Sequence, residues 1–349
     1  MHSGPNDVSD QPADTSPLHA DARQLPLVAV VGPTGSGKSD LALHLAELFH
    51  GEVVNCDSLQ VFRHFDIGTA KLPLAERRGI PHHLIDILEP DALFTAGEFA
   101  RLGRGRIMEI SALGRVPIVA GGTGFYLRAL VEGLFEGPSR DRELRERLAA
   151  RERRRAGSLH RLLARIDRDA AAKIHPHDVP KVTRALEVCL LTRRPVSELF
   201  REGRDALRGY RVLKLGLLPD RDALYSRLDV RCAAMFEHGL VDEVKHILSL
   251  GFSGDEKPFE SHGYKQALQF IRGELNLREA VFYAQRNTRN YAKRQLTWFR
   301  REPDLVWLNG FGVEEKIREA AVERVRWLLE ASIHRRDREK TEEDGENRF

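Results

Sequence analysis

The sequence predicts an α/β fold in which a parallel sheet forms the core and an all-helical domain is inserted into it. Three observations support this. Short apolar runs, such as residues 28–31 and 116–120, are typical of strands buried on both faces of a parallel sheet. Helical patterns alternate with them. Residues 139–210 then show charged helical patterns without a strand signal.

The stretch LVAVVGPTGSGKS, residues 27–39, organises the rest of the chain. Its apolar run ends at Gly32, and Gly32, Gly37, Lys38 and Ser39 match the pattern G-x-x-x-x-G-K-[ST]. A helical pattern follows at residues 40–49. This order of strand, turn and helix is the context of a P-loop, so the core is expected to be of the P-loop NTPase type.

Such a turn is expected to bind a diphosphate, because its backbone N–H groups converge on phosphate oxygens at a helix N-terminus. Lys38 adds a positive charge, and the hydroxyl of Ser39 is a ligand for Mg²⁺, the one cofactor expected. The alternative is a tight turn with an exposed lysine. The predicted diphosphate-binding residues of the turn are Gly32, Pro33, Thr34, Gly35, Ser36, Gly37, Lys38 and Ser39.

Composition is that of a globular protein, with 349 residues, 42% hydrophobic and 31% charged. The three cysteines, Cys56, Cys189 and Cys232, lie far apart, which predicts a reduced cytoplasmic protein without a structural zinc site. Neither a signal peptide nor a membrane span is expected. The predicted organisation is a disordered leader (1–24), core (25–138), helical insertion (139–210), core (211–330) and a disordered charged tail (331–349).

Two further strands are predicted to end in acids. Residues 52–56 lead into Asp57, and 81–86 end in Asp86 and resemble a Walker B strand. The carboxyl ends of parallel strands line the ligand crevice, so Asp57 is expected near the P-loop. A helix N-cap is an equally good interpretation of Asp57. The loop 66–71 is expected to present Thr69 and Lys71 to the same crevice.

A second glycine turn, residues 121–124, follows the strand 116–120 and precedes another helical pattern. The hydroxyl of Thr123 in this turn faces the same phosphates if the turn is functional. A plain strand-to-helix connection is the alternative. Upstream, residues 94–113 are predicted to form a helix interrupted at Gly103 and Gly105.

Basic charge is concentrated in two places. Residues 139–211 hold 20 Lys and Arg against 11 Asp and Glu, which indicates an anionic partner or a solvated helical surface. Residues 286–301 hold six Lys and Arg and no acid. On a helix, one face that is expected to meet phosphate carries Arg286, Arg289, Asn290, Lys293, Thr297 and Arg300. Another face, which is expected to pack, carries Ala284, Tyr291 and Trp298.

Several of these segments together resemble the bacterial tRNA dimethylallyltransferases, also called tRNA isopentenyltransferases. They are GPTGSGKS at 32–39, DSLQVF at 57–62, DIGTAK at 66–71, PHHLID at 81–86, GGTGFYLRAL at 121–130, HGYKQ at 262–266 and KRQLTWFR at 293–300. The likeness keeps order and spacing over residues 25–310. Phe62 and Leu72 depart mildly from the family pattern.

The resemblance implies transfer of a dimethylallyl group from dimethylallyl diphosphate to N6 of adenosine 37, beside the anticodon, in tRNAs that read codons beginning with U. It implies that Asp57 is the catalytic base and that Thr123 acts close to the diphosphate and the base. It also implies that Arg231, or Arg227 in its place, holds diphosphate oxygens. Partners are then a tRNA anticodon arm and the prenyl donor, for an enzyme expected to be a monomer.

The resemblance further implies a set of tRNA contacts in which the insertion and the basic helix grip the anticodon arm. The implied tRNA-binding residues are Asp57, Ser58, Leu59, Gln60, Thr123, Arg145, Pro180, Lys181, Val182, Thr183, Arg184, Gly263, Tyr264, Lys265, Lys293, Arg294, Gln295, Trp298 and Arg300.

Three other functions compete with this one. A P-loop nucleotide kinase or NTPase would use Asp86 as its Walker B acid and the insertion as a lid. An adenylate isopentenyltransferase would prenylate a free nucleotide and would not need the basic regions. The third alternative is an RNA-binding module whose P-loop no longer acts.

Overall fold

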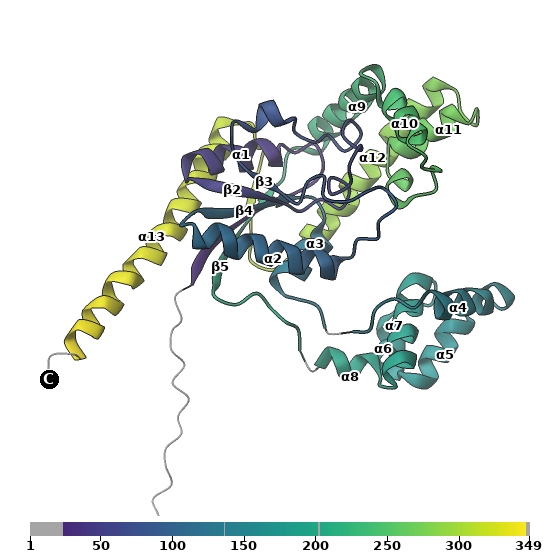
Figure 1. Ribbon diagram of the computed structural model, residues 1–349, viewed down its shortest axis with the longest axis horizontal. Coiled ribbons are helices and arrows are strands. Elements are labelled where there is room, and N and C mark those ends of the chain that lie inside the picture. The colour runs from purple at the N-terminus through teal and green to yellow at the C-terminus, as the bar shows by residue number, and fades with distance from the viewer. Residues whose placement is uncertain (1–23, 136, 202, 347–349) are drawn as a thin grey trace, which may run out of the picture.

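The computed structural model describes residues 24–346 apart from 136 and 202, with side chains described as far as residue 331. The expected leader therefore lies almost wholly outside the described residues. Six parallel strands form one sheet in the order β3-β2-β4-β1-β5-β6 (Figure 1). The strands are β1 (Leu25–Val31), β2 (Gly51–Asn55), β3 (His82–His83), β4 (Val116–Gly121), β5 (Tyr210–Leu217) and β6 (Leu305–Leu308). The predicted α/β fold with a parallel sheet is confirmed.

Thirteen α-helices occur in the described part of the chain. Around the sheet lie α1 (Lys38–Leu48), α2 (Ala96–Ala112), α3 (Gly124–Val131) and α13 (Glu315–Glu346). The insertion contains α4 (Arg142–Arg154), α5 (Ser158–Ile166), α6 (Arg168–Lys173), α7 (Val179–Thr192) and α8 (Val196–Arg201). Beyond the carboxyl edge of the sheet lie α9 (Arg221–Glu237), α10 (Leu240–Ser249), α11 (Tyr264–Ile271) and α12 (Leu277–Phe299). None of the described helices combines the length and apolar character needed to cross a bilayer.

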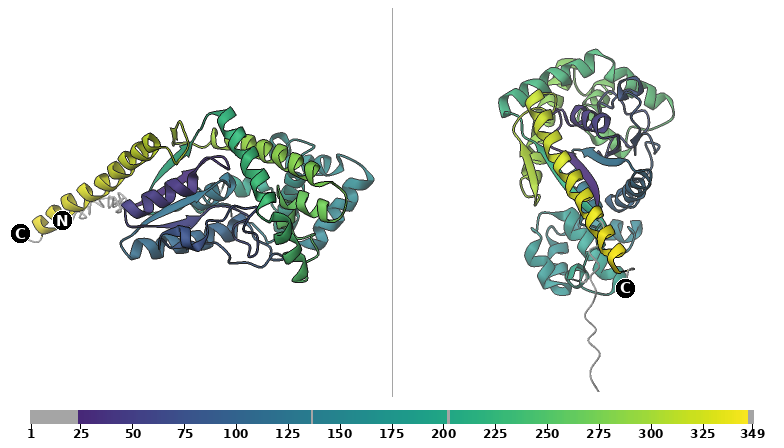
Figure 2. Two further views of the ribbon diagram at one scale, coloured as in Figure 1. Left: turned by 90° about the horizontal axis from the view of Figure 1, so that it is seen from above. Right: turned by 90° about the vertical axis from the view of Figure 1, so that its left-hand side faces the viewer.

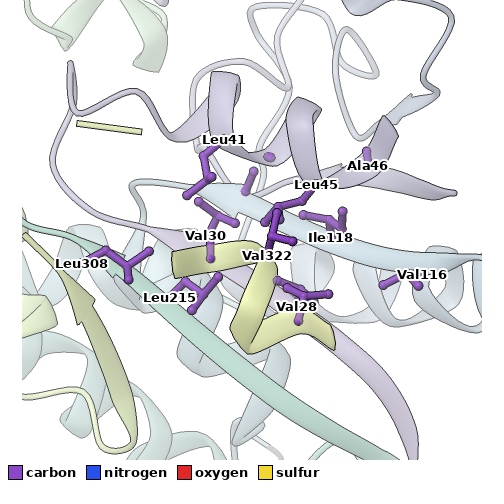
Figure 3. Close-up of a cluster of buried hydrophobic side chains, with 14 of the residues drawn as sticks. Val28, Val30, Leu41, Leu45, Ala46, Val116, Ile118, Leu215, Leu308 and Val322 are labelled. Atoms are coloured by element: carbon purple, nitrogen blue, oxygen red, sulfur yellow. The ribbon is translucent and has the colours of Figure 1, made fainter. Parts of the chain in front are cut away.

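The sheet is covered on both faces, which explains the uninterrupted apolar runs. Val28 and Val30 of β1 point into a core formed with α1 and α13 (Figure 3). Ala29 and Val31 point the other way, into a core formed with α2 and α3. Alternate residues of one strand therefore supply both cores.

The helices α4 to α8 form a separate bundle with its own apolar core, set away from the sheet (Figure 1). A hydrogen-bonded ion pair of 2.7 Å between Arg104 of α2 and Asp205 links the sheet domain to the segment that returns from the bundle. The bundle is thus attached through its connecting segments and has a core independent of the sheet.

Two features differ from the expectations. Gly103 and Gly105 do not interrupt α2, and a Cβ at Gly103 would lie 2.9 Å from Leu130 Cδ1. Gly103 therefore allows α2 and α3 to pack closely. A disordered tail is predicted from residue 331, whereas α13 continues to Glu346 and projects from the sheet (Figure 2). That segment has no proline and no glycine before Gly345, and its charged residues are mostly good helix formers.

A buried ion cluster fastens the end of α12 to the sheet. Glu302 accepts a hydrogen bond of 2.8 Å from Lys214 of β5 and one of 3.1 Å from Arg128 of α3. The Glu302 carboxylate and the Lys214 ammonium are almost completely buried. Each charge is tolerated because the other one neutralises it.

We expect Glu302→Ala to lower the free energy of unfolding by about 3–5 kcal/mol, because it leaves the Lys214 ammonium buried without its carboxylate. Urea unfolding followed by circular dichroism measures this loss. Glu260→Ala is the control, since Glu260 and Lys257 form an exposed pair that contributes about 0–1 kcal/mol. An equal loss in the free energy of unfolding in the two variants would contradict the stabilising role of the buried Glu302 carboxylate.

Candidate active site

A cavity of about 310 Å³ lies at the carboxyl edge of the sheet, between the P-loop, the segment after β2, and helices α9 and α12. Its charged and polar lining includes Lys38, Ser39, Asp40, Asp57, Arg227 and Arg231. Its apolar lining includes Leu59, Ala70, Leu72, Leu228, Cys232 and Met235. Both charged and apolar side chains therefore line the cavity.

The P-loop presents part of its length to this cavity. Thr34, Gly35 and Gly37 line it together with Lys38 and Ser39. The other predicted residues of the turn, Gly32, Pro33 and Ser36, are buried behind it. The Ser36 hydroxyl donates to Pro33 O at 2.8 Å, and Gly312 N donates to Ser36 O at 2.9 Å. The loop after β6 thus supports the turn from behind.

Three cationic side chains line the same cavity, namely Lys38, Arg227 and Arg231. Lys38 Nζ donates to Pro33 O at 2.7 Å. Burial lowers the pKa of Lys38 to about 8, the Asp57 carboxylate opposes this shift, and Arg231 adds to it. Burial and the neighbouring Arg227 also lower the pKa of Arg231. Among the residues that the structure describes, no carboxylate lies within 4.0 Å of the guanidinium of Arg227 or Arg231, so these charges are available to an anion.

Asp57 lies in the cavity, as the sequence predicts, and its backbone is held by Asn55. Asn55 Oδ1 accepts from Asp57 N at 3.1 Å, and Asn55 Nδ2 donates to Leu84 O at 2.9 Å. Asp57 Oδ1 accepts from Leu59 N at 2.8 Å. No described helix begins at Asp57, so the N-cap interpretation is wrong and the side chain forms an Asx turn.

Thr123 supports the Asp57 segment from the second glycine turn. Its hydroxyl accepts from Ser58 N at 3.1 Å, and its backbone N–H donates to Cys56 O at 3.2 Å. Tyr291 of α12 lies near Thr123 and Asp57, and burial together with the charge of Asp57 raises the pKa of Tyr291. The sequence analysis assigned Tyr291 only to a packing face, yet it lines the cavity.

Gln295 of α12 joins the two glycine turns. Its Oε1 accepts from Thr34 N at 2.8 Å, and its Nε2 donates to Gly122 O at 2.9 Å. A Cβ at Gly122 would lie 2.3 Å from Gln295 Nε2, so only glycine leaves room for the amide there. The resemblance implies that Gln295 binds tRNA, whereas the structure shows it buried and engaged with the protein.

The loop 66–71 forms another wall of the cavity, with Gly68, Thr69 and Ala70 in the lining. Tyr264, an implied tRNA contact, is fully buried beneath it and accepts from Gly68 N at 3.0 Å. Lys71 points away and donates to Asp86 at 2.5 Å. The prediction that Lys71 reaches the crevice is therefore wrong, because two carboxylates and a backbone carbonyl satisfy its ammonium outside it.

Asp86, His82 and His83 make their contacts at the edge of the sheet. Asp86 pairs with Lys71 and lies outside the cavity lining, which removes the main argument for a Walker B acid at this position. His83 Nε2 lies 2.6 Å from Glu52 Oε2, and His82 Nδ1 lies 2.9 Å from Ile80 O. Both histidines therefore make hydrogen bonds at the edge of the sheet. Within the described residues no group of three or more His, Cys, Asp and Glu side chains forms a metal site.

The outer face of α12 carries a shallow basic groove of about 380 Å³. It is lined by Asn290, Lys293, Arg294, Thr297, Trp298 and Arg301. The guanidinium of Arg128 stacks over Trp298 at 4.7 Å from the ring centroid. Lys293, Arg294 and Arg300 are exposed, whereas Arg289 forms an ion pair with Asp229.

The remaining implied tRNA contacts are divided between surface and interior. Arg145 and Arg184 both hydrogen-bond to the buried carboxylate of Glu187. Burial raises the pKa of Glu187, but these bonds outweigh burial and lower it to about 2. Val182 is buried in the bundle. The exposed residues of the set are Pro180, Lys181 and Lys265, and the partly exposed ones are Thr183 and Ser58. The cavity is lined by Leu59, Gln60 and Gly263.

Comparison with known proteins agrees with this arrangement. A family profile described as IPP transferase matches residues 60–302. The chain is 77% identical to the tRNA dimethylallyltransferase of Solibacter usitatus over 305 residues, which cover 87% of this chain and 99% of that protein. It is 54% identical to the tRNA dimethylallyltransferase of Koribacter versatilis, over 83% of this chain and 95% of that protein.

Solved structures show the same fold. The tRNA isopentenylpyrophosphate transferase of Bacillus halodurans superposes with a TM-score of 0.67 at 37% identity, over 89% of this chain and 99% of that one. A eukaryotic dimethylallyltransferase acting on tRNA superposes with a TM-score of 0.72 at 30% identity, over 81% of this chain and 73% of that one. The chain therefore belongs to the tRNA dimethylallyltransferase, or IPP transferase, family.

Proposed function

We propose that the protein transfers a dimethylallyl group from dimethylallyl diphosphate to N6 of adenosine 37 in tRNAs that read codons beginning with U, and releases diphosphate. The observation that carries this proposal is the single cavity in which Lys38 and Arg231 face Asp57 at the end of the P-loop. Such a site combines cationic groups that attract a diphosphate leaving group with a carboxylate that can take a proton from the nucleophile.

In the proposed step the bond between the allylic carbon and the diphosphate oxygen breaks, and its electron pair stays with the diphosphate. Backbone N–H groups of the P-loop, Lys38 and Arg231 stabilise that growing negative charge. Preorganised donors of this kind contribute about 2.7–4 kcal/mol each to transition-state stability. The allylic carbon then bonds to N6 of the adenine.

N6 of adenine is a weak nucleophile, because its lone pair is delocalised into the ring. A carboxylate that accepts a hydrogen bond from N6–H orients the amine and takes the proton as the carbon–nitrogen bond forms. We assign this role to Asp57. The assignment is supported by its position, because the side chain borders the cavity and one of its oxygens accepts from Leu59 N. Asn55 and Thr123 hold its segment in position.

Mg²⁺ fits the residues of this site. Ser39 is exposed to the cavity at the start of α1, and Mg²⁺ commonly takes few protein ligands and completes its shell with phosphate oxygens and water. When bound, the ion supplies positive charge to the diphosphate. Ser39 would hold it, while Lys38 binds the same leaving group from the other side of the turn.

The RNA partner is proposed to be the anticodon arm, held between the helical bundle and the basic groove on α12. The exposed charges of Lys293 and Arg294 beside Trp298 support this, because unpaired RNA is bound by cations together with aromatic rings. The target adenine must leave its stack to reach Asp57. We further propose that the enzyme acts as a monomer in the cytoplasm.

One assay separates this function from the alternatives. The protein is incubated with unmodified tRNA, AMP and either dimethylallyl diphosphate or ATP. A gain in mass on a tRNA adenine with the prenyl donor supports the proposal. Modification of AMP alone indicates an adenylate isopentenyltransferase, phosphoryl transfer from ATP indicates a kinase, and tRNA binding without reaction indicates a binding module.

We expect Asp57→Asn to lower kcat by about 10²–10⁴-fold, because the amide cannot take the N6 proton although it still accepts from Leu59 N. tRNA binding should stay nearly intact, and Asp57→Ala should be impaired by orders of magnitude as well. Single-turnover kinetics with saturating donor measures the step. Asp242→Asn, an exposed acid on α10, is the control. Activity of Asp57→Asn within tenfold of wild type would remove Asp57 as the base.

We expect kcat/KM for dimethylallyl diphosphate to fall as the pH rises through about 8. Burial lowers the pKa of Lys38 to about 8, so the free enzyme loses this positive charge as the pH rises through that value. Lys38→Arg should move the fall to higher pH, because the guanidinium stays charged. Lys38→Ala should weaken donor use and remove the inflection. A wild-type profile that is flat from pH 7 to about 9.5 would contradict the assignment.

We expect the affinity for tRNA to fall steeply with salt, because cations of α12 displace counterions from phosphates. Lys293→Ala should flatten the slope of log K against log salt concentration by about one unit or slightly less. Filter binding over a series of salt concentrations measures it. Lys316→Ala removes another exposed lysine, on α13, and should leave the slope unchanged. A salt-independent affinity would be inconsistent with the proposed interface.

A further inference from the structure

The cavity also has apolar lining residues that the leaving-group and proton-transfer steps do not use. Helix α9 contributes Leu228, Cys232 and Met235 to it, and the segment after β2 contributes Leu59. Ala70 and Leu72 complete the apolar lining. An isoprenoid chain needs such a surface, since apolar groups are stabilised by leaving water.

Helix α9 carries the cationic and the apolar lining on adjacent positions. Arg227, Arg231 and Met235 are spaced four residues apart, so they lie one above the other on the same helix face. With a rise of about 1.5 Å per residue, Met235 lies about 6 Å beyond Arg231 along the helix. That length is about the length of one isoprene unit extending from a diphosphate held at Arg231.

Met235 lines the cavity and also contacts a buried apolar cluster. Its side chain packs against the buried cluster that contains Phe65, Phe236 and Tyr264. Phe65 and Tyr264 of that cluster are fully buried, so closely packed side chains fill the region behind Met235. A donor with a second isoprene unit would therefore collide with Met235.

We propose that Met235 sets the chain length of the prenyl donor, admitting one isoprene unit and rejecting two. This inference rests on the proposed function and adds the residue that selects among donors. Met235 makes contact with the end of the chain and takes no part in proton transfer. Cys232 lies between Arg231 and Met235 along α9 and forms the side wall along which the chain lies.

The test compares kcat/KM for geranyl diphosphate with kcat/KM for dimethylallyl diphosphate, using the full chain and unmodified tRNA. Met235→Ala shortens the residue proposed to limit the chain, and the ratio of geranyl to dimethylallyl transfer should rise about tenfold or more, as is typical for pocket size discrimination. The ratio is measured on one preparation, so it is independent of the fraction of folded enzyme. Mass spectrometry of the modified nucleoside identifies which chain was transferred.

Two variants control this experiment. Met235→Leu conserves volume and should keep the ratio within about threefold of wild type. Val230→Ala shortens a side chain on the exposed side of α9, where the residue is 68% exposed, and should change neither ratio nor rate. If the ratio of geranyl to dimethylallyl transfer rose as much in Val230→Ala as in Met235→Ala, the cause would be a general loosening of α9. That result would overturn the inference.

The remaining outcomes are distinct. A ratio in Met235→Ala equal to that of wild type would overturn the role of Met235. A raised KM for tRNA with an unchanged donor ratio would show that the apolar lining receives the adenine and would also overturn it. Failure of the wild-type protein to transfer either chain would instead refute the proposed function.

Discussion

The site depends on one buried amide. Gln295 accepts from the P-loop at Thr34 N and donates to the second glycine turn at Gly122 O, so a single side chain of α12 fixes both turns. An amide buried in this way is stable only if both its ends are satisfied. Any displacement of α12 relative to the sheet would break these bonds. The helix that carries the basic groove is therefore held in register with the phosphate-binding turn.

Contacts within the protein also limit which hydrogen-bond donors the P-loop can offer to an anion. The N–H groups of Thr34 and Ser36 are engaged within the protein, by Gln295 Oε1 and Pro33 O. Charge must then supply much of the attraction for an anion. Lys38, Arg227 and Arg231 border one cavity, and their proximity together with burial lowers the pKa of Lys38 and of Arg231. Binding of a diphosphate relieves this repulsion, so the site favours a multiply charged anion.

The sequence predicted the parts of the fold that depend on local pattern. Apolar runs located the strands, and the rule for carboxyl ends of strands placed Asp57 beside Lys38. Local sequence pattern did not predict the contacts that Gln295 and Tyr264 make. Thr34 and Gln295 are 261 residues apart, and no periodicity shows that they meet. Tyr264 is in a motif rich in polar residues, yet packing beneath the loop 66–71 buries it fully.

An excess of Lys and Arg in the sequence indicates free positive charge only if no acid lies close to those residues in the fold. The insertion has many more cations than acids, but Arg145 and Arg184 are committed to the buried carboxylate of Glu187. On α12, Lys293 lies two residues before Gln295, so these side chains lie on different sides of the helix, one toward the groove and one toward the cavity. RNA bound on the outer face thus contacts the same rigid helix that positions the phosphate-binding turn. Under the proposed function, one structural element therefore supports both recognition of the RNA and orientation of the donor.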